Sequence, residues 1–442
     1  MKKVITYGTY DLLHYGHIRL LQRAKELGDY LIVGVTADDF DKTRGKINVQ
    51  QSLSERIAGV RATGLADEII VEEYEGQKID DVRRLDVDIF TVGSDWKGYF
   101  DYLSAYCEVV YLDRTKGVSS SEIRNEKRAI TLGLVGEEDY INKVASEASY
   151  VNGLQLSGIY ALSYTKIEEV LKKTKKCETY EELIEKSDAV YIRSNPLFHY
   201  EQVKYALKQG KHILCESPIA LQEKQCKELF DIARNNNCIL TEGIKTAFST
   251  AYYRLILLAK TRKIGDIISV DATCTSLKKR IDDVDITWNS MYEWGPTALL
   301  PVFQILGRKY NRMEFATKFL DKQNKFDIFT KVSFVYPNAV ATIKVGCGMK
   351  SEGELVISGT EGYIYVPAPW WKTDYFEVRY EDSSNNKRYF YQLDGEGIRY
   401  ELADFVRTIE SGKKSLYISE KVSEEISNVM EAFQLKKNMF LL

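Results

Sequence analysis

The first part of the chain alternates short apolar runs with amphipathic stretches. The apolar runs are rich in β-forming residues and lie at 3–6, 30–35, 68–71, 88–92 and 108–112. Between them, apolar residues recur with helical spacing at 18–27, 54–63 and 78–85. Strands that alternate with helices predict a parallel, doubly wound α/β sheet. Such a sheet binds ligands outside the carboxyl ends of its strands, so the segments that follow its strands are the first places to look for chemistry.

A second alternation begins near residue 130 and predicts a second, Rossmann-like domain. Its expected strands are 130–136, 156–162, 189–193, 211–215 and 238–241, and its expected helices are 138–150, 166–173, 180–186, 199–209 and 222–236. After about residue 246 the pattern changes to strands near 266–277, 328–335, 339–346, 353–358, 361–366, 375–380 and 388–393, closed by helices at 397–411 and 420–435. These favour an α+β domain with an open, largely antiparallel sheet. We therefore predict three domains, at 1–128, 129–246 and 247–442.

Composition narrows the class of protein. The chain has 442 residues, of which 44% are hydrophobic and 28% charged, as in an ordinary globular protein of two or three domains. A net charge of -3 gives no electrostatic footprint for nucleic acid or an anionic membrane, and no apolar run has transmembrane length. Seven scattered cysteines without a C-x-x-C pair fit free thiols in a reducing compartment. We expect a cytoplasmic protein without nucleic-acid or membrane partners.

Candidate chemistry first appears directly after the first strand. Residues 7–17 read Tyr-Gly-Thr-Tyr-Asp-Leu-Leu-His-Tyr-Gly-His and lead into a helix. A strand that opens into a helix through a glycine-bearing turn presents backbone N–H groups and the positive end of the helix dipole. His14 and His17 are two of only four histidines, and their spacing at a helix start places them on one face. Two imidazoles at such a turn suit a phosphate chain.

A second anion site is predicted after the fifth strand. Arg114 begins the run Arg-Thr-Lys-Gly-Val-Ser-Ser-Ser-Glu, in which serines followed by a glutamate indicate a capped helix start. A plain helix cap would be the default interpretation of Ser119 alone. The interpretation as an anion site gains weight because Arg114, Gly117 and three hydroxyls occur together.

Three stretches, GTYDLLHYGH, VGSDWKG and RTKGVSSSEIR, together resemble the glycerol-3-phosphate cytidylyltransferase family within the HxGH nucleotidyltransferases. The resemblance covers about residues 2–127. It implies transfer of CMP from CTP to a small phosphorylated alcohol, release of pyrophosphate, and Mg²⁺ as cofactor. In-line attack at the α-phosphorus needs positioning and charge neutralisation rather than a covalent nucleophile. The family also implies a role in making a bacterial surface polymer such as capsule or teichoic acid.

The resemblance assigns roles to individual positions. The implied catalytic residues are His14, His17 and Arg114. The implied CTP-binding residues are Gly8, Thr9, Tyr10, Asp11, Gly16, Asp95, Thr115, Ser119 and Ser120, with Asp11 as the candidate metal ligand. The implied phosphoalcohol-binding residues are Arg44, Lys46, Arg56 and Lys78. Residues 75–78, Glu-Gly-Gln-Lys, replace an aromatic-led version in the glycerol-phosphate enzymes, so glycerol, ribitol, erythritol, choline and ethanolamine phosphates all remain open.

Residues 129–435 resemble a second family, the Gfo/Idh/MocA oxidoreductases, through stretches such as SDAVYIRSNPLFHYEQVKYALKQGKHILCESPIAL and ELVISGTEGYIYVP. The positions that carry chemistry in that family depart from its pattern. Gly136 is followed by Glu-Glu-Asp where further glycines would hold a dinucleotide. The family's Glu-Lys-Pro is Glu216-Ser217-Pro218, and its catalytic His and Asp positions hold Thr297 and Leu300.

These departures favour a degenerate oxidoreductase half that serves dimerisation, packing or ligand sensing, with NAD(P) binding left open. The alternative is a bifunctional enzyme whose second half is an NAD(P)-dependent reductase that makes the polyol phosphate. A third hypothesis is a non-catalytic protein that binds CTP without consuming it. The resemblance also implies a homo-oligomer formed through the sheet of the C-terminal half.

Overall fold

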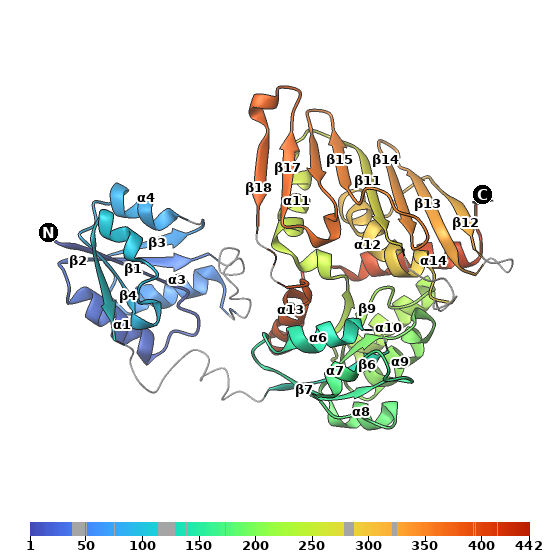
Figure 1. Cartoon of the computed structure of the whole chain (residues 1–442), viewed down its shortest axis with the longest axis horizontal. Helices are drawn as coiled ribbons and strands as arrows, with labels where there is room; N and C mark the ends of the chain where they lie inside the picture. The colour runs from blue at the N-terminus through green and yellow to red at the C-terminus, as the bar shows by residue number, and fades with distance from the viewer. Residues whose placement is uncertain are drawn as a thin grey trace. The chain divides into compact units, whose positions relative to one another are not determined.

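The structure is a computed structural model that describes residues 1–37, 49, 51–74, 76–113, 129–137, 139–172, 174–277, 287–320, 325–391, 393, 395–412 and 414–442. The chain forms two compact units, Met1–Ala129 and Ile130–Leu442 (Figure 1). The further division that the sequence suggests at residue 246 stays a prediction. No helix in these described ranges combines the length and apolar character that crossing a membrane requires.

The first unit contains a five-stranded, fully parallel sheet with the order β3-β2-β1-β4-β5. The strands are β1 Lys3–Gly8, β2 Tyr30–Thr36, β3 Glu68–Glu72, β4 Ile89–Gly93 and β5 Glu108–Leu112. The helices are α1 Tyr15–Lys25, α3 Leu53–Ala62 and α4 Gln77–Arg84, with 3-10 turns η1 Ser94–Trp96 and η2 Asp101–Ala105. The doubly wound prediction is confirmed. The strand order reverses at β1, which marks the carboxyl ends of β1 and β4 as the ligand crevice of such a sheet.

The sheet of the first unit is covered on both faces, and β1 shows how the sequence achieves this. Val4 packs in one buried cluster with Leu21 and Val33, whereas its neighbour Ile5 packs in another with Phe90. Successive side chains of a strand point to opposite faces, so a strand buried on both sides reads as a continuous apolar run. This burial fixes β1 and therefore the place where the following turn begins.

The second unit begins with another parallel sheet, with the order β10-β9-β8-β6-β7. Its strands are β6 Ile130–Gly136, β7 Leu154–Tyr160, β8 Ala189–Arg193, β9 His212–Glu216 and β10 Leu240–Gly243. Its helices are α6 Tyr140–Ala148, α7 Glu168–Leu171, α8 Tyr180–Lys186, α9 Pro196–Lys208 and α10 Glu223–Asn235. This confirms the predicted Rossmann-like arrangement, although α7 is much shorter than the expected helix.

The remainder of the second unit is a nine-stranded mixed sheet against which α12 packs (Figure 1). The strands are β11 Ile267–Thr275, β12 Arg312–Phe319, β13 Asp327–Val335, β14 Val340–Gly346, β15 Leu355–Gly359, β16 Tyr363–Val366, β17 Tyr375–Arg379, β18 Lys387–Phe390 and β19 Met439–Leu441. The helices are α11 Thr250–Lys260, α12 Ser290–Ile305, α13 Ile398–Ser411 and α14 Glu420–Gln434, with 3-10 turns η3 Lys245–Phe248, η5 Trp370–Lys372 and η6 Ser383–Asn385.

The pairing in this sheet is largely antiparallel, as predicted, but β11–β14 and β12–β19 pair in parallel. The sequence did not indicate α11, α12, β12 or β19. The sequence does not predict α12 because Pro296 and Pro301 lie inside it, and proline normally ends a helix. The edge strand β19 is only three residues long, too short for an alternating pattern to show.

Candidate functional site

The turn between β1 and α1 has an unusual backbone that the sequence supports locally. Tyr10 and Leu12 adopt positive φ values of 54° and 47°. The Tyr10 ring is buried and folds back over Gly8, where an added Cβ would lie 3.0 Å from the ring. Only glycine fits beneath the ring without displacing it. The last residue of β1 thus allows the compact turn that leads to the two histidines.

His14 and His17 lie at the start of α1 with their rings stacked. The ring centroids are 3.9 Å apart at an interplanar angle of 22°, and the Tyr10 ring meets His17 edge-on at 5.5 Å. His14 is the N-cap of α1, and its Nδ1 accepts the Gly16 N–H at 3.1 Å. An accepting Nδ1 carries no proton, so in neutral His14 the N–H is on Nε2. The pair therefore presents a hydrogen-bond donor at the positive end of a helix dipole.

Arg56 ties this turn to the neighbouring elements. Its buried guanidinium donates to the carbonyl oxygens of Thr9 at 2.7 Å, Thr36 at 2.9 Å and Gln51 at 3.1 Å. The planar fork of arginine suits several carbonyl acceptors at once. Its predicted contact with a phosphoalcohol stays a prediction, while these contacts give it a positioning role for the backbone around Thr9.

Gln51 is a site residue that the sequence did not reveal. Its side-chain oxygen accepts the Leu12 N–H at 2.8 Å, and its own N–H donates to Asp11 Oδ1 at 3.0 Å. Asp11 is buried, and this bond fixes its carboxylate within the turn between β1 and α1. Gln51 lies forty residues after the turn and belongs to no recognisable motif, so no signal in a single sequence points to it.

Lys78 lies in a buried network at the carboxyl end of β3. It forms an ion pair with Glu72, which also accepts the Thr36 hydroxyl at 2.9 Å, and its ammonium group is 4.6 Å from the centre of the Tyr7 ring. The Tyr7 hydroxyl donates to Asp81 at 2.9 Å, and burial raises the pKa of Tyr7 well above its usual value. The ammonium group of Lys78 therefore pairs with Glu72 in this structure. Its binding to a phosphoalcohol stays a prediction.

Several predicted site residues lie outside the described part of the chain: Arg44, Lys46, Arg114, Thr115, Ser119 and Ser120. Asp95 lies in η1 after β4, and its side chain is also outside it. The structure brings the other predicted positions to the carboxyl edge of β1: Gly8, Thr9, Tyr10, Asp11, His14, Gly16 and His17. Within the described ranges, no group of three or more His, Cys, Asp or Glu side chains forms a metal cluster. Magnesium binding at Asp11 therefore stays a prediction.

Gly136 ends β6, at the position where a dinucleotide-binding domain has its glycine-rich turn, and the backbone requires a glycine there. Gly136 has φ 149°, and an added Cβ would lie 2.3 Å from the Arg193 carbonyl oxygen. Beyond it the turn carries Glu137 and Asp139, and α6 begins only at Tyr140. The Arg193 guanidinium lies 4.7 Å from the centre of the Tyr140 ring and pairs with Glu293 at 3.1 Å.

These residues do not fit a dinucleotide held in the usual way. The pyrophosphate of such a cofactor lies at this helix N-terminus and needs close approach of glycine backbone. Here carboxylate-bearing residues occupy the turn, and the Tyr140 and Arg193 side chains pack together at the first turn of the helix.

At the end of β9, the half-buried Glu216 lies in an acid pair with the buried Glu401. The Tyr191 hydroxyl lies within hydrogen-bond distance of Glu216 and, at 3.3 Å, of Glu401. A phenol has one proton, so it can donate to only one of them, and the other carboxyl must donate to it. Burial, followed by the charge of Glu216, raises the pKa of Glu401 well above its usual value, which identifies Glu401 as the protonated partner.

Of the other substituted positions of the oxidoreductase half, Ser217 has a structural contact, as does His199, which matches the family pattern. The Ser217 hydroxyl bonds to the buried Glu242, and Ser217–Pro218 is a cis peptide. Thr297 lies within α12. His199, which lies near the start of α9, is buried with both ring nitrogens at 2.8 and 2.9 Å from the carbonyl oxygens of Pro218 and Ser194. These contacts connect loops of the domain.

Three lysines from separate elements of the second unit converge on one carboxylate. Glu396 lies 2.6 Å from Lys372 and 3.4 Å from both Lys143 and Lys245. The hydrogen bond from Lys372, with support from the other two charges and against the effect of burial, lowers the pKa of Glu396 to about 2. Burial, opposed chiefly by Glu396, lowers the pKa of Lys245.

Comparison with known proteins matches both parts of the chain. A family profile described as "Cytidylyltransferase-like" matches residues 5–126, and one described as "Oxidoreductase family, NAD-binding Rossmann fold" matches residues 130–244. Glycerol-3-phosphate cytidylyltransferase of Bacillus spizizenii is 48% identical over 130 residues, which is 29% of this chain and 100% of that protein. The enzyme of the same name from Staphylococcus aureus is 50% identical over 126 residues, 28% of this chain and 95% of that protein.

Among solved structures, the second unit shares its fold with a 3-ketoreductase. The 3-ketoreductase KijD10 from Actinomadura kijaniata, solved with NADP, superposes with a TM-score of 0.64 at 15% identity and covers 71% of this chain and 99% of its own. At that identity the likeness concerns the fold alone. The chain therefore joins a domain that belongs to the cytidylyltransferase family, close to the glycerol-3-phosphate cytidylyltransferases, to an oxidoreductase domain of the Gfo/Idh/MocA family.

Proposed function

We propose that this protein transfers CMP from CTP to a small phosphorylated polyol of the glycerol-3-phosphate type, giving a CDP-alcohol and pyrophosphate. The observation that carries the proposal is the stacked pair His14 and His17 at the N-terminus of α1. Similarity over the whole length of enzymes named for this reaction supports it. The Gln-Lys sequence at 77–78 leaves the choice of polyol open.

In this reaction the substrate phosphate attacks the α-phosphorus of CTP in line, the new P–O bond forms, and pyrophosphate leaves. The protein must hold the two anions together and neutralise charge that builds on the transferring group. His14 donates from Nε2 to the phosphate chain, and His17 stacks against it to extend the same donor surface. Arg56 holds the Thr9 carbonyl so that the turn stays open to the nucleotide. Mg²⁺, when bound, supplies further charge neutralisation, and the Asp11 carboxylate is the oxygen ligand proposed for it.

The test is pyrophosphate release by the full chain with CTP and glycerol 3-phosphate. His17→Ala should lower turnover by about two to three orders of magnitude, as expected when a transition-state donor is removed. His212→Asn is the matched control, because His212 lies on β9 of the second unit and bonds to the Ile239 N–H. Full activity of the His17 variant would contradict the proposal, as would CTP binding without pyrophosphate release.

For the second unit we propose a scaffold or ligand-sensing role rather than a dinucleotide-dependent reductase. The observations that favour this are the carboxylates after Gly136 and the packing of Arg193 against Tyr140. We further propose that the protein is cytoplasmic, forms a homo-oligomer through the mixed sheet, and supplies a bacterial surface polymer with its activated alcohol. Analytical ultracentrifugation of the full chain tests the oligomer, and a monomer at micromolar concentration would contradict it.

A further inference from the structure

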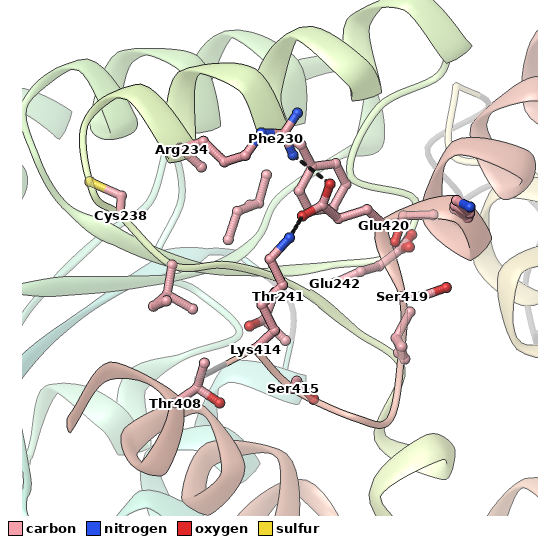
Figure 2. A pocket seen from close by; sticks show the side chains of 16 residues that line it. Phe230, Arg234, Cys238, Thr241, Glu242, Thr408, Lys414, Ser415, Ser419 and Glu420 are labelled. Atoms are coloured by element: carbon pink, nitrogen blue, oxygen red, sulfur yellow. Dashed lines mark hydrogen bonds and ion pairs between the residues drawn. The ribbon is translucent and has the colours of Figure 1, made fainter. Parts of the chain in front are cut away.

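A pocket of about 340 Å³ opens in the second unit beside β10, the edge strand of the parallel sheet (Figure 2). Its walls come from the C-terminal part of α10, from β10 and from the segment 414–423 that leads into α14. Ligand pockets in proteins span roughly 300–1,000 Å³, so this one suits a small molecule. None of the residues assigned to cytidylyl transfer lines it.

Three cationic side chains line the pocket: Arg234, Lys414 and Lys421. The Glu420 carboxylate lies between the first two (Figure 2), accepting from Arg234 at 2.5 Å and from Lys414 at 2.6 Å. Burial alone would raise the pKa of Glu420, but the hydrogen bonds from Lys414 and Arg234 outweigh it and lower that pKa. Glu420 is therefore an anion. Arg234 also pairs with Asp231 at 2.5 Å, so the three cations and these two carboxylates leave one positive charge at this wall.

The N-terminus of α14 adds to this positive wall. Ser419 is its N-cap but makes no side-chain capping hydrogen bond, and four residues of its start, Ser419, Glu420, Lys421 and Ser423, line the pocket. The first N–H groups of a helix and its dipole attract anions, above all phosphate. Cations and a helix N-terminus together form a site for a multiply charged anion rather than for a neutral molecule.

Glu242 on β10 makes a separate demand on the ligand. Its side chain lines the pocket in a residue only 2% exposed, and one carboxyl oxygen accepts the Ser217 hydroxyl. Burial raises the pKa of this carboxyl, although Ser217, Ser423 and the Ile219 backbone oppose the rise. The other oxygen, Oε2, is buried and makes no hydrogen bond of standard geometry within the described part of the chain. A buried polar atom left unpaired costs about 1–3 kcal/mol, so a group that bonds to it is favoured. A ligand hydroxyl would be such a group.

We propose that this pocket binds the phosphate monoester of a small polyol, with the phosphate against Arg234, Lys414 and the first turn of α14 and a hydroxyl against Glu242. When it binds, the phosphate replaces the Glu420 carboxylate as the hydrogen-bond acceptor of Arg234 and Lys414. The site deepens the ligand-sensing role proposed for the second unit. It lies wholly in that unit and requires no catalysis in the first. It gives the second unit a ligand whose chemistry matches the alcohol phosphates used by relatives of the first.

The test is hydrogen–deuterium exchange of the full chain during titration with glycerol 3-phosphate, ribitol 5-phosphate, inorganic phosphate and glycerol. A phosphorylated polyol should slow exchange in segments 230–243 and 414–425 at a midpoint about tenfold lower than inorganic phosphate. The His17→Ala chain should show the same protection, which separates this site from the first unit. Protection confined to the first unit, or equal midpoints for phosphate and both phosphorylated polyols, would overturn the proposal.

Two variants sharpen the result. Arg234→Met should raise the midpoint about tenfold, because a charge-assisted hydrogen bond is lost. Arg262→Met is its matched control, since Arg262 is exposed, pairs with Asp266 at 2.7 Å and does not line the pocket. Glu242→Gln should raise the midpoint for the phosphorylated polyols and leave that for inorganic phosphate unchanged. Equal responses of the two arginine variants, or of both ligands to Glu242→Gln, would overturn it.

Discussion

The rings of His14 and His17 lie 3.9 Å apart and nearly parallel, and His14 also caps the helix that carries both. One residue thus serves two purposes in the proposed mechanism: its Nδ1 satisfies a helix N–H, and its Nε2 is the donor proposed for the phosphate chain. Because the cap fixes the orientation of the ring, the same hydrogen bond that starts α1 determines where the N–H proposed for catalysis points.

The two roles of His14 can be separated by substitution. Asn is among the best N-caps, so His14→Asn should keep α1 within about 0.5 kcal/mol of its original stability, whereas His14→Ala should cost about 1 kcal/mol. Both should lower pyrophosphate release by about two orders of magnitude. Hydrogen exchange over 15–25 measures the helix, and turnover measures the chemistry. An active His14→Asn enzyme would show that His14 acts only as a cap.

Arg56 should be a positioning residue for the β1–α1 turn. Arg56→Met leaves buried carbonyl oxygens of Thr9 and Thr36 without this donor, at about 1–3 kcal/mol each. Arg56→Lys should recover little, because an ammonium group cannot reproduce the fork. We expect lower kcat and lower stability together, measured by turnover and by thermal unfolding. Arg61→Met, an exposed change on the same helix α3, is the control and should alter neither.

The buried pair Lys78–Glu72 offers a test that separates structure from binding. Lys78→Met strands a buried carboxylate and should cost about 3–5 kcal/mol in the first unit, and adding Glu72→Gln should restore most of it. Because the double variant is nearly as stable as the original protein, any change in its kinetics reports the loss of the predicted contact between Lys78 and the ligand. If Lys78 binds the phosphoalcohol, the double variant raises KM for glycerol 3-phosphate about tenfold. An unchanged KM would remove Lys78 from the binding site.

The β–α alternation of the first unit could be predicted because its strands are buried on both faces and therefore read as continuous apolar runs. The phosphate-type turn could be predicted because its glycines and histidines are adjacent in the sequence. The contacts of Gln51 with Leu12 and Asp11 could not, because they join residues forty positions apart through one side chain.

The same limit applies to the second unit. The loss of the dinucleotide glycines is visible after Gly136, but the packing of Arg193 against Tyr140 depends on how β8 and α6 meet. The pocket beside β10 draws on residues from 230 to 423 and contains no motif. Helix α12 was missed for a local reason, since its two internal prolines break the pattern that identifies a helix.

The turn after Gly136 leads to a prediction about the cofactor. Calorimetric titration of the full chain with NADH and NADPH should show no saturable binding at micromolar concentrations, because the carboxylates of Glu137 and Asp139 would face the pyrophosphate. CTP serves as the positive control in the same cell. One-per-chain binding of either dinucleotide would contradict the scaffold role and would justify a search for a keto-sugar phosphate substrate.

Asp327 at the start of β13 gives the second unit a pH-dependent stability. It is fully buried, its oxygens accept from the Met291 N–H at 3.1 Å and the Thr330 hydroxyl at 2.6 Å, and burial raises its pKa to about 7 despite these bonds. In the unfolded chain an aspartate has a pKa of about 4. The folded state therefore holds the proton more tightly, and its contribution is complete below about pH 4 and is lost as pH rises toward 7.

Asp327→Asn removes this titration while keeping the size of the side chain. Three pKa units correspond to about 4 kcal/mol. Between pH 4.5 and 8, the free energy of unfolding of the variant should therefore rise relative to that of the original protein by up to this amount. Urea unfolding followed by tryptophan fluorescence measures the difference at each pH. A constant difference for Asp327→Asn would mean that this carboxyl stays ionised in the fold and that another acid sets the pH dependence.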